Sequence, residues 1–162
     1  MDEVVVIRVA LETVPLRDYL KTVDGRLRDL RTPNRQAAAA LLRRIRSSFD
    51  RQKTPEGTPW KRLQKSTIRL RAFRGNPTQP ALQETGYLRS GFRAYSGRAD
   101  FAVENIRGYA DLQNSGNPAS PFFGTRTRLP ARRFMPIVGN DVVMPDDWWD
   151  EVMAPFDRLF DV

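Results

Sequence analysis

The sequence contains no cysteine and no histidine. Without cysteine the chain has no disulfide, no thiolate metal ligand and no cysteine nucleophile, and without histidine it lacks the commonest general base and metal ligand. Neither of the glycine-rich phosphate-loop strings, G-x-G-x-x-G and G-x-x-x-x-G-K-S/T, occurs. These absences remove most templates for catalysis, and we expect no catalytic residue, no cofactor and no metal.

Long hydrophobic runs are missing as well. No stretch of roughly 18 apolar residues, the length that spans a membrane, is present. The chain begins with the acidic Met1-Asp2-Glu3, which lacks the basic region of a secretory signal. We therefore expect a protein that is made in a cytoplasm and has no membrane partner. Its 162 residues, 40% of them hydrophobic, suit one domain with a core.

What the chain has is an uneven distribution of charge. Residues 26–74 hold 15 Lys and Arg against 3 acids, a balance of +12, whereas residues 141–162 hold 7 acids against Arg158 alone, a balance of −6. A basic middle and an acidic end favour either contact with DNA or pairing between neighbouring subunits. Composition alone does not choose between the two.

Two helices are predicted in the first third of the chain, after a strand at the β-branched residues 4–11. The first, from Pro15, has apolar residues at helical spacing that predict one buried stripe: Leu16, Tyr19, Leu20, Val23 and Leu27. The second runs over residues 34–52 with Thr32 as its cap, and its apolar face comprises Ala38, Leu41, Leu42, Ile45 and Phe49. Its arginines project elsewhere, toward DNA, solvent or another subunit: Arg35, Arg43, Arg46 and Arg51.

The following segment is predicted to turn sharply. Proline at 55 presets φ, Gly57 supplies a positive φ, and Trp60 returns as a large apolar anchor, so this turn clamps two helices together. Ser66 and Thr67 suit the cap of a short basic helix that ends at residue 74. A loop over 75–80 and a helix over 82–92 follow. That helix should give Leu82, Leu88 and Phe92 to the core, with Gly86 allowing a close approach.

The last part of the chain alternates as strands do before it becomes helical. Residues 92–95 and 101–106 predict a hairpin that residues 109–113 continue, and residues 135–138 and 141–144 predict a second one, because Gly139-Asn140 suits a type II′ turn. A helix starts at Pro145 with acids in its first turn, and Pro155 should kink or interrupt it. We therefore expect an α+β domain over residues 1–144, with helices and the helical clamp on a small, mainly antiparallel sheet, and an acidic aromatic interaction helix over 145–162.

Three ordered motifs in this sequence resemble a known family. They are F…P-x-G-x-x-W…L-x-x-S-T with L-x-x-T-G-x-L-R over residues 49–89, Tyr109-Ala110 with Gly116, and L-P-A-R-R-F over 129–134. The chain is similar here to the phage virion morphogenesis (tail completion) family of Mu-type phages, although Gln113-Asn114 stand where that family has His-Gln. The motif positions, to which we assign structural roles, are Phe49, Pro55, Gly57, Trp60, Leu63, Ser66, Thr67, Thr85, Gly86, Leu88, Tyr109, Ala110, Gly116, Pro130, Ala131, Arg132 and Phe134.

The resemblance implies a structural virion protein of the tail or neck, which acts in tail completion or head–tail joining. It implies a ring of copies around the DNA path, a hexamer being one option, that contacts tail terminator, tube or connector proteins. A nonspecific DNA-binding protein is the alternative, because basic residues cluster beside Trp60 and Phe73. Candidates for contact with a partner or the DNA channel are Arg43, Arg46, Lys61, Arg62, Lys65, Phe122, Phe123, Trp148, Trp149 and Phe156.

Two further features allow alternative interpretations. A pair of carboxylates can hydrolyse a substrate without histidine, and the available acids are Glu84, Asp100, Glu104 and Asp111. Glu84 falls on an expected exposed helix turn and Asp100 in a hairpin turn, so we interpret these acids as structural. The aromatic pair Phe122-Phe123 either meets a partner or folds onto its own domain.

Overall fold

The computed structural model describes residues 14–116 and 129–160 and shows an α+β fold. The expected strand at 4–11 and the pair Phe122-Phe123 lie outside the described residues. The elements, in chain order, are α1 (Val14–Leu27), α2 (Arg31–Arg51), α3 (Lys65–Phe73), α4 (Tyr87–Ser90), β1 (Phe92–Ser96), β2 (Phe101–Asn105), α5 (Ala110–Ser115), β3 (Ile137–Val138), β4 (Asp141–Val142) and α6 (Asp146–Asp157). The predicted fold class is confirmed.

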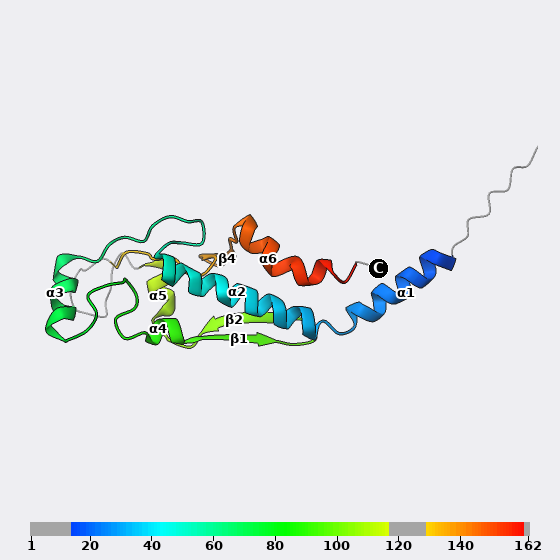
Figure 1. The fold of residues 1–162 in the computed structure, drawn as a ribbon, viewed down its shortest axis with the longest axis horizontal. Coiled ribbons are helices and arrows are strands. Elements are labelled where there is room, and N and C mark those ends of the chain that lie inside the picture. Colours follow the sequence, from blue (N-terminus) through cyan, green and yellow to red (C-terminus); the bar gives the residue numbers. More distant parts are fainter. Residues whose placement is uncertain (1–13, 117–128, 161–162) are drawn as a thin grey trace, which may run out of the picture.

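Helix α2 is the centre of the arrangement. It contacts α6 on one side and the β1–β2 hairpin on the other, while α3 lies at one end of the molecule and α1 extends from the other (Figure 1). Its apolar face is buried as predicted, with Ile45 and Phe49 both 0% exposed. Arg35, Arg43, Arg46 and Arg51 are exposed, which confirms that they point away from this face.

The core is built on four aromatic rings. Phe49, near the end of α2, lies 5.4 Å from Trp60, 5.8 Å from Phe92 and 5.1 Å from Phe134 between ring centroids, and its contacts with Trp60 and Phe92 are edge-on. Phe92 and Phe134 also meet edge-on at 5.7 Å. Edge-to-face pairs of this kind contribute about 0.5–1.5 kcal/mol beyond their buried area. Each ring comes from a different segment, so the cluster joins four parts of the chain.

The predicted turn at Pro55 and Gly57 is present. Gly57 has φ +89°, its N–H donates to Thr54 O at 2.9 Å, and the Trp60 N–H donates to Gln52 O at 2.8 Å. Trp60 is 7% exposed and its indole Nε1–H donates to Arg133 O at 2.8 Å, which makes it the core anchor that we expected. Through this contact the turn clamps α2 to the 129–134 segment, so the prediction that it clamps two helices together is wrong.

Both predicted hairpins are antiparallel. In the first, Phe92 pairs with Asn105 and Ser96 with Phe101, and the backbone of its turn accepts a hydrogen bond from the Asn34 side chain at 3.0 Å. The second is short, with Ile137 opposite Val142 and Gly139 at φ +61° in its two-residue turn. This φ is the one that a type II′ turn requires of its first residue.

The helix predicted over 82–92 is wrong for most of its length. Leu82 has φ +61° and Gly86 has φ +74°, two left-handed positions that no continuous helix contains, and only Tyr87–Ser90 are helical. A Cβ on Gly86 would meet nothing within 4 Å, so this glycine supplies a positive φ and not a close approach. Leu88 and Phe92 are nevertheless buried, as expected.

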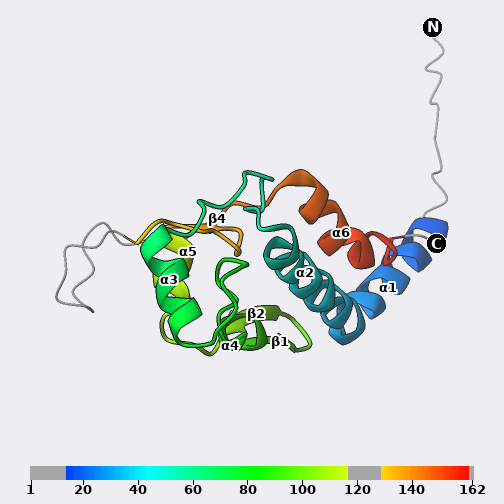
Figure 2. The same ribbon diagram turned by 60° about the vertical axis from the view of Figure 1, so that its left-hand side comes forward.

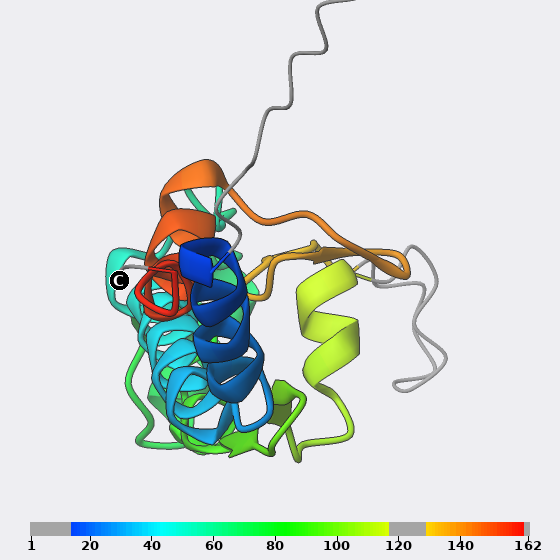
Figure 3. The same cartoon turned by 90° about the vertical axis from the view of Figure 1, so that its right-hand side faces the viewer.

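Four other local predictions are also wrong. Residues 110–115 form α5 instead of extending β2, and Thr32, Ser66 and Thr67 lie inside helices that have no side-chain cap. The stripe on α1 is not buried, since Tyr19, Leu20 and Leu27 are 40, 56 and 45% exposed. Helix α1 extends past the end of α2 (Figure 1) and lies in front of it when that end faces the viewer (Figure 3). Finally, α6 runs through Pro155 to Asp157 without interruption.

The aromatic cluster generates a stability prediction. Phe49→Ala should lower the free energy of unfolding by about 3–5 kcal/mol, because it removes a buried ring and leaves a cavity that its three neighbours cannot fill. Phe73→Ala is the matched control: Phe73 is 89% exposed, and its loss should change stability by less than about 0.5 kcal/mol. Urea unfolding followed by tryptophan fluorescence measures both. Equal effects of the two substitutions would contradict the central place of Phe49.

Candidate functional site: a basic groove between α3 and α5

A groove of about 1040 Å³ lies at the end of the molecule that holds α3. Figure 2 brings this end forward, with α3 in front of α5. All three sequence motifs supply lining residues, although they are far apart in the chain. Those residues are Leu63, Thr67, Thr85, Leu88, Tyr109, Gly116, Pro130, Ala131 and Arg132.

Close backbone packing shapes one wall of the groove. Gly116 has φ +74°, and a Cβ added there would lie 2.6 Å from Ala131 N and 2.9 Å from Leu129 O. Both the backbone angle and the space therefore require glycine at this position. The motifs Y-A…G and L-P-A-R-R-F are thus in direct contact.

Arg132 is a buried charged residue in the lining of the groove. It is 5% exposed, its Nε–H donates to Lys61 O at 2.9 Å, and its backbone N–H donates to Gln113 O at 3.0 Å. Burial, together with the nearby charge of Arg71, lowers the pKa of Arg132. Within residues 14–116 and 129–160, the ion pairs do not include Arg132. A buried guanidinium without a carboxylate is unfavourable, so this part of the groove is suited to an anion.

Arg71, on the opposite wall, has its partners within the fold. It donates to Pro80 O at 3.0 Å and lies 3.4 Å from Glu84, which also accepts a hydrogen bond from Asn76 at 2.9 Å. Arg71 was not predicted as a site residue, because in the sequence it is one of several cations on a basic helix. Its spacing of four residues from Thr67, on the face that turns toward the groove, was the available signal.

Three of the four carboxylates considered for hydrolysis have hydrogen-bond or ion-pair partners. Glu84 belongs to the Arg71 network, Glu104 accepts from the Tyr95 hydroxyl at 2.9 Å, and Asp111 accepts from the Ser115 hydroxyl at 3.2 Å. These three come from separate elements, and each bond is local. The structure thus gives these acids structural contacts.

Asn114 fixes the segment that carries Arg132. It is 4% exposed, and its Oδ1 accepts from the backbone N–H groups of Phe134 and Met135, both at 3.0 Å. Its neighbour Gln113 has a buried Oε1 without a hydrogen-bond partner in the described part of the chain. The sequence marked both positions as departures from the family pattern but gave no sign of these bonds.

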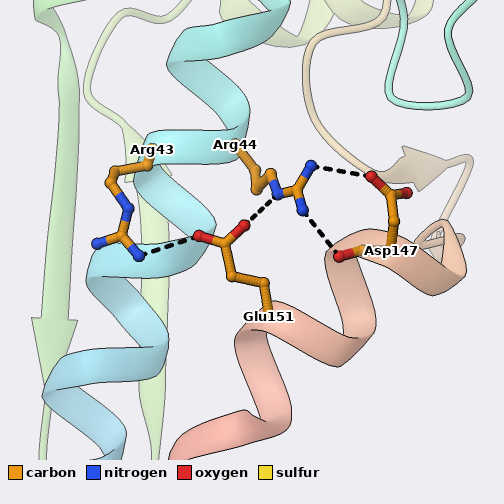
Figure 4. A network of polar contacts seen from close by, with 4 residues as sticks. All are labelled: Arg43, Arg44, Asp147 and Glu151. Atoms are coloured by element: carbon orange, nitrogen blue, oxygen red, sulfur yellow. Dashed lines mark hydrogen bonds and ion pairs between the residues drawn. The ribbon is translucent and has the colours of Figure 1, made fainter.

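A second polar network joins α2 to α6 (Figure 4). Arg44 donates to both Glu151 and the Asp147 carboxylate, the latter at 2.9 Å, and to Asp147 O at 3.0 Å, while Arg43 donates to Glu151 at 3.0 Å. Arg43, a candidate for contact with a partner or DNA, keeps an exposed side chain while it makes this ion pair. Arg44 was not among the predicted site residues, because the acids that it binds lie more than 100 residues away in the chain.

The aromatic residues of α6 divide between core and surface. Trp148 is 1% exposed and belongs to the same core cluster as Phe49, so the expectation that it docks on a partner is wrong. Phe156 is half-buried and stacks on Phe101 with 6.3 Å between ring centroids. Trp149 is 51% exposed and remains available. Helix α6 is therefore packed on the domain by one face.

Among the described residues, no three His, Cys, Asp or Glu side chains gather in a way that could hold a metal ion. None of the described helices is long and apolar enough to cross a membrane.

The fold therefore defines a class of protein: a small α+β domain with a basic groove that three sequence motifs assemble. The profile of the phage virion morphogenesis family matches residues 11–150. The chain belongs to that family, which points to a structural, virion-associated protein. Neither the curated proteins nor the solved structures give a significant match.

The Asn114 bonds predict a loss of stability on substitution. Asn114→Leu should cost about 2–6 kcal/mol, because leaving one buried N–H unpaired costs about 1–3 kcal/mol and two would be left. Gln113→Leu is the adjacent control and should cost less, since its buried oxygen has no partner to lose. Urea unfolding gives the stabilities, and hydrogen exchange should show the Phe134 amide exposed only in the Asn114 variant. Equal costs would contradict the assignment.

The α2–α6 network predicts a pH dependence. Burial raises the pKa of Glu151, but hydrogen bonds from Arg43 and Arg44 outweigh it and lower this pKa below the usual 4.5. A lowered folded-state pKa means that the charged carboxylate stabilises the fold above pH 4.5 and that this contribution is lost as the pH falls through the folded-state pKa. Glu151→Gln should therefore destabilise the protein at pH 7, and the difference from wild type should shrink on acidification.

Urea unfolding at pH 7 and at about pH 3, below the ordinary range of a glutamate, measures this difference. Asp150→Asn is the control, because Asp150 is exposed and forms no ion pair in the described part of the chain. A Glu151→Gln deficit that stays constant over this range would show that the ion pairs do not contribute.

Proposed function

We propose that this protein is a structural component of the phage tail or neck that acts in tail completion or head–tail joining. It would work as a ring of copies around the DNA path, assembled by surface complementarity and without turnover of a substrate. Family membership supports the class of protein. The observation that carries the finer proposal is the separation of charge in the fold: exposed cations gather on and beside α3, and exposed acids on the outer face of α6.

The separation of charge survives after internal pairing. On the basic side, Lys61, Arg62, Lys65 and Arg69 are exposed and form no ion pair within the described residues. On the acidic side, Asp147 and Glu151 are used by α2, whereas Asp146, Asp150 and Asp157 are not. Complementary surfaces of this kind steer association and set its register. Such surfaces suit a protein that joins others.

Nonspecific DNA binding is the second candidate. Arg46 is exposed on α2 and forms no ion pair in the part of the chain that the structure describes, and with the cations near α3 it could contact phosphates of packaged DNA. A gel shift at two salt concentrations with the purified protein tests this candidate. DNA binding predicts a complex that weakens steeply with salt, by a factor set by the number of phosphate contacts.

The main proposal predicts a defect of assembly. Deleting the gene from the phage or prophage that carries it should leave filled heads and tails that fail to join, or tails whose ends are not completed. Electron microscopy would show either defect. A wild-type copy supplied in trans should restore infectious particles, and mass spectrometry should find the protein in them. Normal particles from the deletion, or mature particles without the protein, would overturn the proposal.

A further inference from the structure

The outer face of α6 is an acidic aromatic stripe. Helical spacing places Asp146, Trp149, Asp150, Met153, Asp157 and Phe160 on one side of the helix and its extension. Trp149 and Phe160 are each 51% exposed, although the opposite face of the helix buries Trp148 and Val152 in the core. The stripe therefore combines exposed rings with acids that form no ion pair among the described residues.

The groove end of the molecule has the complementary composition. Four cations and one carboxylate line the groove, and Leu70 and Phe73 on the adjoining surface of α3 are 47 and 89% exposed. The apolar lining includes Leu63, Leu82 and Leu88. The lining also includes the buried Arg132, whose guanidinium has no carboxylate partner within the described chain. The groove thus combines an apolar lining with positively charged side chains.

One chain cannot bring these two surfaces together. Helix α6 is held along α2 by Arg44 and Trp148, whereas α3 lies beyond the opposite end of α2 (Figure 1). A contact between the stripe of one copy and the groove of the next uses different surfaces on the two partners. Contacts of this head-to-tail kind close into rings when the rotation allows and otherwise build filaments.

DNA matches the groove less well than a helix does. Phosphates would satisfy the cations, but they would leave Leu70, Phe73 and the leucines of the groove without an apolar partner. The α6 stripe supplies both parts, since Trp149 can bury a large ring against the leucines beside an arginine while Asp146 and Asp150 face the lysines and arginines. Charge and apolar complementarity together select a second copy of this chain.

We infer that the groove between α3 and α5 binds the acidic aromatic stripe of α6 from a second copy, with Trp149 as the anchor. This interface rests on the proposed function in that it supplies the contact by which copies would form a ring. It assigns the basic α3 surface to a neighbouring subunit and leaves the exposed α2 arginines free to face the DNA path.

Two variants, each blocked on one surface, test the interface. Lys61→Glu/Arg62→Glu reverses the groove side, since both residues line the groove, and Asp146→Lys/Asp150→Lys reverses the stripe side. All four residues are exposed, so both variants should fold. Wild type should associate with rising concentration in sedimentation velocity, and each variant alone should be at least about tenfold weaker. Mixed in equal amounts, the two should associate again, because each intact surface finds its intact counterpart and each reversed surface its reversed counterpart.

Matched controls separate this interface from general effects. Arg35→Glu/Arg46→Glu changes the net charge as much as the groove variant does and should leave association unchanged. Trp149→Ala should weaken association at least about tenfold, whereas Tyr95→Ala, which removes a ring of similar exposure on the hairpin, should not. Circular dichroism confirms that each variant is folded.

Three results would overturn the inference: a wild-type chain that stays monomeric at all concentrations, a mixture that does not regain association, or equal loss in the controls. A groove variant that loses affinity for a labelled DNA duplex but still self-associates would assign the surface to DNA instead. Virion composition separates this interface from the function. If the protein is found in virions but the mixed variants fail to associate, the interface is disproved and the function is not. If the variants associate but the protein is absent from virions, the function is disproved and the interface is not.

Discussion

The edge-to-face packing around Phe49 is the interaction on which the rest of the structure depends. This ring is the last residue on the buried face of α2. Its centroid lies 5.1–5.8 Å from the ring centroids of Trp60, Phe92 and Phe134. Its backbone carbonyl accepts hydrogen bonds from Gln52 at 2.7 Å and Gln83 at 3.0 Å, so the end of the helix is capped by the segments that the ring brings together. Because edge-to-face geometry is directional, the cluster fixes orientation as well as proximity.

The groove follows from this cluster. Trp60 and Phe134 each lie within two residues of a groove residue, Arg62 and Arg132 respectively, and Trp60 is bonded through its indole to Arg133 O. Arg133 in turn pairs with Glu56 at 2.6 Å, which attaches the tip of the turn to the same segment. The apolar core and the basic groove are therefore built from the same chain segments.

The sequence predicted the elements whose signal is local. Helix α2, both hairpins and the start of α6 have strong periodicity or a defined turn, and each is present. The sequence failed where a distant contact decides the outcome. Leu82 adopts a positive φ that no local pattern predicts. The apolar residues Tyr19, Leu20 and Leu27 of α1 are exposed within the part of the chain that the structure describes.

The groove was predictable only in part. The resemblance marked its motif positions. However, the ion pairs of Arg44 and Arg71 and the two hydrogen bonds that Asn114 accepts from the backbone involve partners that sequence spacing does not reveal. Residue type likewise does not separate Trp148 from Trp149, which are adjacent and equally apolar. Only the position of α6 on α2 buries the first and exposes the second.

The attachment of α6 has a consequence for assembly. A terminal helix held only by its sequence neighbours would have to be ordered when a partner binds, at a cost of about 0.5–1.5 kcal/mol for each immobilised side chain. Here Trp148 and Val152 bury one face, and Arg44 fixes the first two turns, before any partner arrives. The exposed stripe is thus presented on a rigid support, and more of its contact energy remains for binding. In the interface that we propose, the internal packing of one half of α6 would make the other half an effective surface for joining subunits.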